Sequence, residues 1–166
     1  MPLRPATKDI YLLINSEFDV SNTSLTGGVQ IHTGKWGQDR TDPTIACYNK
    51  DEGVIDGGET NQTAFSGQAT GGTMQRRGGS VTIDCVAGTR DELRGAGAGG
   101  ADLNPKQVRF ELAKEVVRIT QSFGLTGYDS LAPGSTTDLV ATSDEEDVKP
   151  TFLTQVPVRY TYQNRP

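Results

Sequence analysis

The sequence has little of what metalloenzymes and disulfide-stabilised domains depend on. Its 166 residues include one histidine and two cysteines. Cys47 and Cys85 are too few for a disulfide scaffold, so we expect two buried thiols. A zinc site needs three or four converging ligands, which His32 and two dispersed cysteines do not supply. The sequence therefore predicts no metal site and no cofactor.

Large apolar residues are also scarce. Val, Leu, Ile and Phe make up 35 of the 166 residues, just above the share found in disordered chains. No apolar run approaches the roughly 18 residues of a membrane-spanning helix. Glycine, with 20 residues, indicates many turns and loops. We expect a single domain over residues 1–166, with a small α+β core and long loops that need contacts outside the domain to be stabilised.

Positive charge is the third shortage. Asp and Glu number 21 against 16 Lys and Arg, giving a net charge of −5. This balance provides no basic footprint for nucleic acid, although an acidic wall can line a path along which nucleic acid slides without sticking. An acidic, lysine-poor surface suits a salt-rich environment, and an ordinary acidic protein fits equally well. We expect the run Asp144–Asp147 to be solvated, since it lacks the ligand spacing of a calcium loop.

Two segments have the apolar spacing of amphipathic helices. Thr7–Phe18 repeats apolar residues at intervals of three and four. The second segment, Asn104–Phe123, is longer and has Asn104 as N-cap, Pro105 at the first helical position and Gly124 where a left-handed C-cap belongs. We expect this long helix to pack on one face of a sheet.

Strands are predicted around these helices. They are Val29–Thr33, Thr44–Asn49, Ser80–Ala87, Asp138–Thr142 and Thr151–Tyr162. Leu125–Pro133 is predicted to be an irregular connection. Pro157 has no N–H to donate, which predicts an edge position or a bulge for the last strand. The order of elements predicts an α+β fold with a mixed or antiparallel sheet.

Two segments are rich in glycine. Gly53–Gly79 contains eight glycines among 27 residues, and a loop of that length is usually functional or disordered. We expect an extended arm that lies on a surface outside its own domain, because its few apolar residues do not offset the cost of ordering it. Gly95–Gly100 predicts a flexible loop. It lacks the Lys-Ser/Thr ending of a nucleotide-binding loop.

The sequence shows no catalytic constellation. A histidine-based mechanism would have to use His32, and no nucleophile signature accompanies it. Asp91 and Glu92 are adjacent on a loop, so their carboxylates do not converge on a substrate. For an enzyme or a small-ligand binding domain, the first residues to check are His32, Asp39 and Asp84. We expect no catalytic residues.

Four residues are candidates for a subunit interface. Trp36 and Phe65 lie in predicted loops, and aromatic residues are enriched at interfaces. Packing onto their own domain is the alternative for both. Arg76 and Arg77 stand together in the predicted arm, either as an anchor for an acidic neighbour or as a solvated pair.

The succession of elements resembles a known family. A strand ending at Cys85–Thr89, a long helix over Pro105–Ile119, a variable loop and a terminal strand containing Val156–Tyr160 are similar to tail-terminator, or tail-completion, proteins of long-tailed viruses. The likeness is clearest over Ser80–Tyr162. The acidic, lysine-poor composition resembles proteins of viruses that infect halophilic archaea.

This resemblance implies a structural protein of the virion, without enzymatic activity, assembled in the host cytoplasm. It implies an α+β subunit of a homo-oligomeric ring, commonly a hexamer, at the head-proximal end of the tail. The partners would be the tail tube protein and a neck or stopper protein, and the genome would pass through the lumen without specific binding. Another neck or tail component, either a stopper or a tube subunit, is the first alternative. The arm Gly53–Gly79 would then reach a neighbouring subunit, the tube or the neck.

Overall fold

The computed structural model describes Pro2 and residues 4–25, 28–37, 43–56, 75–87, 104–141 and 150–164. Within these ranges the chain forms two α-helices, a short 3-10 helix and one mixed sheet, which confirms the α+β class. The elements in chain order are α1 (Ala6–Glu17), η1 (Val20–Asn22), β1 (Gln30–Thr33), β2 (Thr44–Asp56), β3 (Gln75–Val86), α3 (Pro105–Ser122), β4 (Ser130–Pro133), β5 (Thr137–Ala141) and β6 (Thr151–Asn164).

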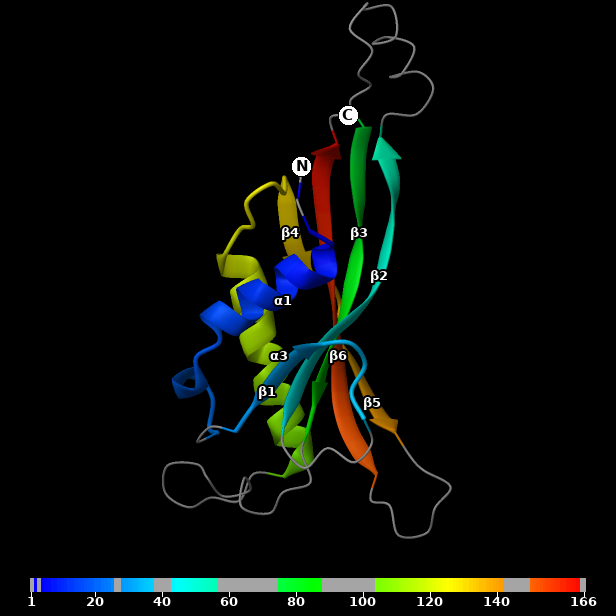
Figure 1. Ribbon diagram of the computed structural model, residues 1–166. Helices are drawn as coiled ribbons and strands as arrows, with labels where there is room; N and C mark the ends of the chain where they lie inside the picture. The colour runs from blue at the N-terminus through cyan, green and yellow to red at the C-terminus, as the bar shows by residue number, and fades with distance from the viewer. Residues whose placement is uncertain are drawn as a thin grey trace, which may run out of the picture.

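Three long strands form the middle of the sheet. The order is β1-β2-β3-β6-β4, and β5 also pairs with β6. The β1–β2 pair is parallel and the other pairs are antiparallel. Figure 1 shows α1 and α3 on the same side of the sheet, while β2, β3 and β6 continue past α1 toward the end where the N- and C-termini lie. One face of the sheet is thus covered by helices, and the ends of β2, β3 and β6 extend beyond them. We call the part of the sheet formed by residues 51–56, 75–80, 130–133 and 158–164 its distal half.

The core lies between the helices and this face of the sheet. The side chains that close it come from both helices and all three long strands. Its fully buried members include Ile10, Ile14, Ile45, Val81, Ile83, Leu112, Val116, Ile119, Val156, Val158 and Tyr160. Cys47 and Cys85 are free thiols buried in it, as predicted. Burial raises the pKa of Cys47 to about 12, so this thiol stays protonated.

The ends of α3 differ in how well local signals predict them. Asn104 Oδ1 accepts the Gln107 N–H at 2.9 Å, and Pro105 occupies the first turn. At the other end the prediction of a left-handed C-cap at Gly124 is wrong, because Phe123 leaves the helix in an extended conformation with φ −119°. The chain reverses later, at Gly127, which has a φ of 88°.

The prediction that Pro157 marks an edge or a bulge is wrong. β6 is an inner strand, paired with β3 from Leu153 to Asn164 through an unshifted register. On its other side β5 pairs as far as Gln155 and β4 begins at Val158, so Pro157 lies at the break between them. Gly134 donates its N–H to the Pro157 carbonyl at 2.6 Å, which shows that the Pro157 backbone faces this break. No ladder donor is needed there, so proline is tolerated inside the sheet.

The arm predicted over Gly53–Gly79 needs correction at both ends. Residues 53–56 belong to β2 and residues 75–79 belong to β3, where Gly53 lies opposite Gly78 and Val54 opposite Arg77. Pairing between the two strands satisfies backbone groups that a free arm would leave to an outside partner. Residues 57–74 of the predicted arm lie outside the described residues, as does the Gly95–Gly100 loop. β4 is a further strand, inside the connection predicted to be irregular.

Candidate interaction surface

The face of the sheet opposite the helices carries a small cluster around Trp36. The indole covers Ala46, Val86 and Leu153 and is 9% exposed. Its Nε1 donates to Asp84 Oδ2 at 2.8 Å. Trp36, a predicted interface residue, therefore packs onto its own domain, which is the second of the two possibilities considered for this side chain.

Tyr48 completes the same cluster. Its hydroxyl donates to Asp84 Oδ2 at 2.6 Å, and Gln155 Nε2 lies 3.4 Å from the Tyr48 oxygen. Burial, followed by the hydrogen bond to Asp84, raises the pKa of Tyr48 to about 12. The phenol thus remains a hydrogen-bond donor, and the buried Asp84 carboxylate accepts two bonds at one oxygen.

His32 and Asp84, two of the residues to check for catalysis, stand in one cross-strand row. Ala46 separates them, since it pairs with His32 on β1 and with Asp84 on β3. Two strand spacings amount to roughly 10 Å, too far for a direct hydrogen bond. His32 Nε2 and Asp84 Oδ1 are buried without a hydrogen-bond partner in the described part of the chain. Asp39 lies outside that part.

Metal-ligating side chains do not gather anywhere in the described ranges. No group of three or more His, Cys, Asp or Glu residues there is placed to hold an ion. Likewise, none of the described helices is long and apolar enough to cross a membrane.

Three tyrosines bind the distal half of the sheet to α1. The Tyr128 ring meets Tyr160 and Tyr162 edge-on, with centroids 5.7 and 5.9 Å away. Tyr128 donates to Asp9 Oδ2 of α1 at 2.9 Å, and Tyr160 donates to Glu52 Oε1 of β2 at 3.0 Å. Burial and then the Glu52 carboxylate raise the pKa of Tyr160. These phenols therefore act as fixed donors that join β6, β2 and α1.

Two further predicted interface residues, Arg76 and Arg77, lie near the end of the β2–β3 pair. Arg77 Nε is 3.5 Å from Glu52 Oε2, so its charge is matched within the chain on the helix side of the sheet. Arg76 is exposed and, as the next residue on the strand, points to the other face. Phe65 lies outside the described residues. Among the predicted interface residues that the structure describes, Arg76 is thus the one that remains available to a partner.

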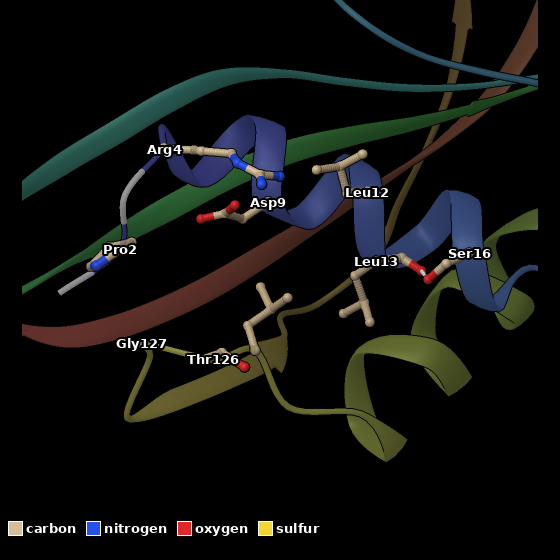
Figure 2. A pocket seen from close by; sticks show the side chains of 9 residues that line it. Pro2, Arg4, Asp9, Leu12, Leu13, Ser16, Thr126 and Gly127 are labelled. Carbon is tan, nitrogen blue, oxygen red and sulfur yellow. Dashed lines mark hydrogen bonds between the residues drawn. The ribbon is translucent and has the colours of Figure 1, made fainter.

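A groove of about 630 Å³ runs between α1 and the turn that follows α3. Figure 2 shows Leu13 extending from α1 on the side where Thr126 and Gly127 lie, with Arg4 and Asp9 toward the N-terminal end of α1. The lining residues are Pro2, Arg4, Asp9, Leu12, Leu13, Ser16, Leu125, Thr126 and Gly127. Sequence reasoning missed this groove because its two walls come from segments more than 100 residues apart.

The distal half of the sheet also leaves apolar side chains exposed. Val54 is 49% exposed and Ile55 is 57% exposed, both at the end of β2. β1 pairs with β2 only from Thr44 to Cys47, so the outer edge of β2 beyond Cys47 has no strand partner among the described residues. Lying together, an open edge and exposed apolar residues are typical of a surface that meets another chain.

The sequence matches no protein-family model and no curated protein.

Proposed function

We propose that this protein is a structural subunit of a homo-oligomeric ring, the tail terminator that caps the tail tube of a long-tailed virus and joins it to the neck. The observation that carries the proposal is the extension of the sheet beyond its helices. There the outer edge of β2 pairs with no other described strand, and Val54 and Ile55 are exposed. A chain of this kind gains stability when a neighbour covers that end.

The specific role in a tail comes from the resemblance over Ser80–Tyr162. Its three parts correspond to β3, α3 and β6, and α3 packs against both strands. The net charge of −5 favours a wall past which a genome moves without specific binding. The partners are other copies of the chain, the tail tube protein and the neck or stopper protein, with a hexamer as the expected ring.

Mass measurement and electron microscopy of the purified chain test this function, alone and with tail tubes. We expect closed rings of uniform size that bind one end of a tube. A chain that remains monomeric and never binds tubes or neck protein contradicts the proposal.

The same images separate two related structural roles. A tube subunit extends into long cylinders on its own, whereas a terminator forms a ring and stops. A stopper binds the neck protein and leaves tube ends uncapped.

A further inference from the structure

The distal half of the sheet is a four-stranded layer with two open edges. Its order is β2-β3-β6-β4, because β1 pairs only with the first four residues of β2 and β5 only with the first five of β6. β2 forms one edge and β4 the other, and neither has an outer strand partner in the described ranges. Every pair in this layer is antiparallel, so the strands alternate in direction.

An even number of alternating strands has a consequence for assembly. β2 and β4 run in opposite directions, so β2 of one copy can lie antiparallel to β4 of the next without turning either copy over. We propose that residues 51–56 of β2 pair with Ser130–Pro133 of β4 on the adjacent copy, so that one sheet continues around the ring. This inference rests on the proposed ring and identifies the surfaces that close it. Such a head-to-tail contact is heterologous, and heterologous contacts generate rings when the rotation closes.

The backbone of β4 has groups facing outward for this pairing. Gly134 donates to Pro157 on β6, and successive residues of a strand alternate in the direction of their backbone groups. Leu131 and Pro133 therefore turn their backbone groups away from β6, to the open edge. Leu131 contributes an N–H and a carbonyl, and Pro133 contributes a carbonyl.

The side chains complement each other as well. Glu52 faces the helix side, where Tyr160 donates to it, so Val54, two residues on, faces that side too. On the adjacent copy, the helix side of β4 carries Leu131, and the apolar groove of Figure 2 lies beside the turn that leads into this strand. Pairing of the two edges brings the exposed Val54 toward Leu131. Burial of these groups favours the contact.

Paired cysteines on the full chain test the contact. Gly53 and Ala132 are both exposed and lie on the face opposite the helices, and a side chain at Gly53 meets open space. Adjacent strands bring Cα atoms within disulfide reach. We expect mild oxidation of G53C/A132C to give a ladder of covalent species at multiples of 17.8 kDa, ending at the ring size. If β2 and β4 of the adjacent copy pair two residues out of this register, the pair D51C/A132C is expected to give the ladder instead.

The controls separate this contact from random collision. Each single variant gives no ladder, and a mixture of G53C and A132C chains gives dimers only. The pair G53C/Q121C, with Gln121 exposed on α3, gives no ladder either.

The two proposals fail in different ways. If rings form but neither G53C/A132C nor D51C/A132C gives a ladder, the edge contact is overturned and the proposed ring stays intact. A chain that is monomeric before oxidation, at every concentration, overturns the ring and the contact together.

Discussion

Gly79 shows how a single backbone position shapes the distal sheet. It lies opposite Glu52, just past an irregularity in the β2–β3 register between Tyr48 and Asp51. A Cβ at position 79 would collide with the backbone carbonyl of Asp51, whereas a Cβ at Gly53 has no atom within 4 Å. The glycine at 79 is therefore needed for close approach of two strands.

Substitution of Gly79 by Ala is expected to lower the free energy of unfolding by about 1–3 kcal/mol, because the two strands must move apart. Gly53→Ala is the matched control and is expected to change it by less than about 0.5 kcal/mol. Urea unfolding followed by circular dichroism measures both. Equal effects at the two positions contradict the close approach.

Glu115 joins the first half of the chain to α3. It is buried, and its carboxylate receives Arg118 Nη2 at 2.6 Å and Nε at 2.9 Å. Asn22 Nδ2 and the Asp19 N–H each lie 3.3 Å from the same group. Burial raises the pKa of Glu115, but these hydrogen bonds together outweigh it, so the pKa lies below its ordinary value of 4.5.

Glu115→Gln is expected to destabilise the fold by about 1–3 kcal/mol at pH 7, because the substitution removes a charged acceptor. Since the native pKa is lowered, the contribution of the carboxylate is complete above its unfolded pKa and is lost as pH falls through the native pKa. The difference in the free energy of unfolding between wild type and E115Q should therefore shrink below about pH 4.5. Denaturant unfolding from pH 3 to pH 7 measures it, and a difference independent of pH contradicts the assignment.

At the scale of elements, the Trp36 segment closes the face of the sheet that the helices leave uncovered. Trp36→Phe is expected to lower the free energy of unfolding by about 2–4 kcal/mol. It removes apolar burial and leaves Asp84 with Tyr48 as its remaining donor among the described residues. Because the indole is internal, the ring should assemble at the same mass under native conditions. Thermal unfolding and mass measurement of the same sample test both parts. Loss of assembly with unchanged stability would instead make Trp36 an interface residue.

Local signals predicted some of these elements. Asn104 and Pro105 fix the start of α3 through interactions within one turn, so the sequence alone carries them. The β3 residues Val81 and Ile83 alternate with polar neighbours and predict a half-buried strand. The distal ends of β2 and β3 escaped prediction because glycines and charged residues there lack the apolar alternation of a half-buried strand, although their backbones pair.

Long-range contacts account for the other differences. Trp36 and Asp84 are 48 residues apart, and neither carries a local sign of the other. Pro157 was predicted at an edge because sequence does not show that β4 and β5 share β6 and leave a break between them. The groove beside α1 is likewise invisible until α1 and the turn after α3 come together.

At the scale of the whole molecule, the exposed end of β2 is expected to serve assembly rather than folding. The double variant V54S/I55S should leave the free energy of unfolding of the isolated chain within about 1 kcal/mol of wild type, because both side chains are already about half exposed. It should weaken ring formation at least tenfold, because it removes apolar area that a neighbour buries. Phe110→Ser, at a residue 63% exposed on α3, is the matched control and should leave ring formation unchanged. Sedimentation over a range of concentrations measures the association, and equal effects of the two variants contradict a contact through β2.

The most direct test of the ring is the mass of the native assembly. Native mass spectrometry of the purified chain should give one dominant species at an integer multiple of 17.8 kDa, expected to be six, whose electron micrographs show closed rings. A single species at 17.8 kDa, unchanged at high concentration and in the presence of tail tubes, would contradict the account.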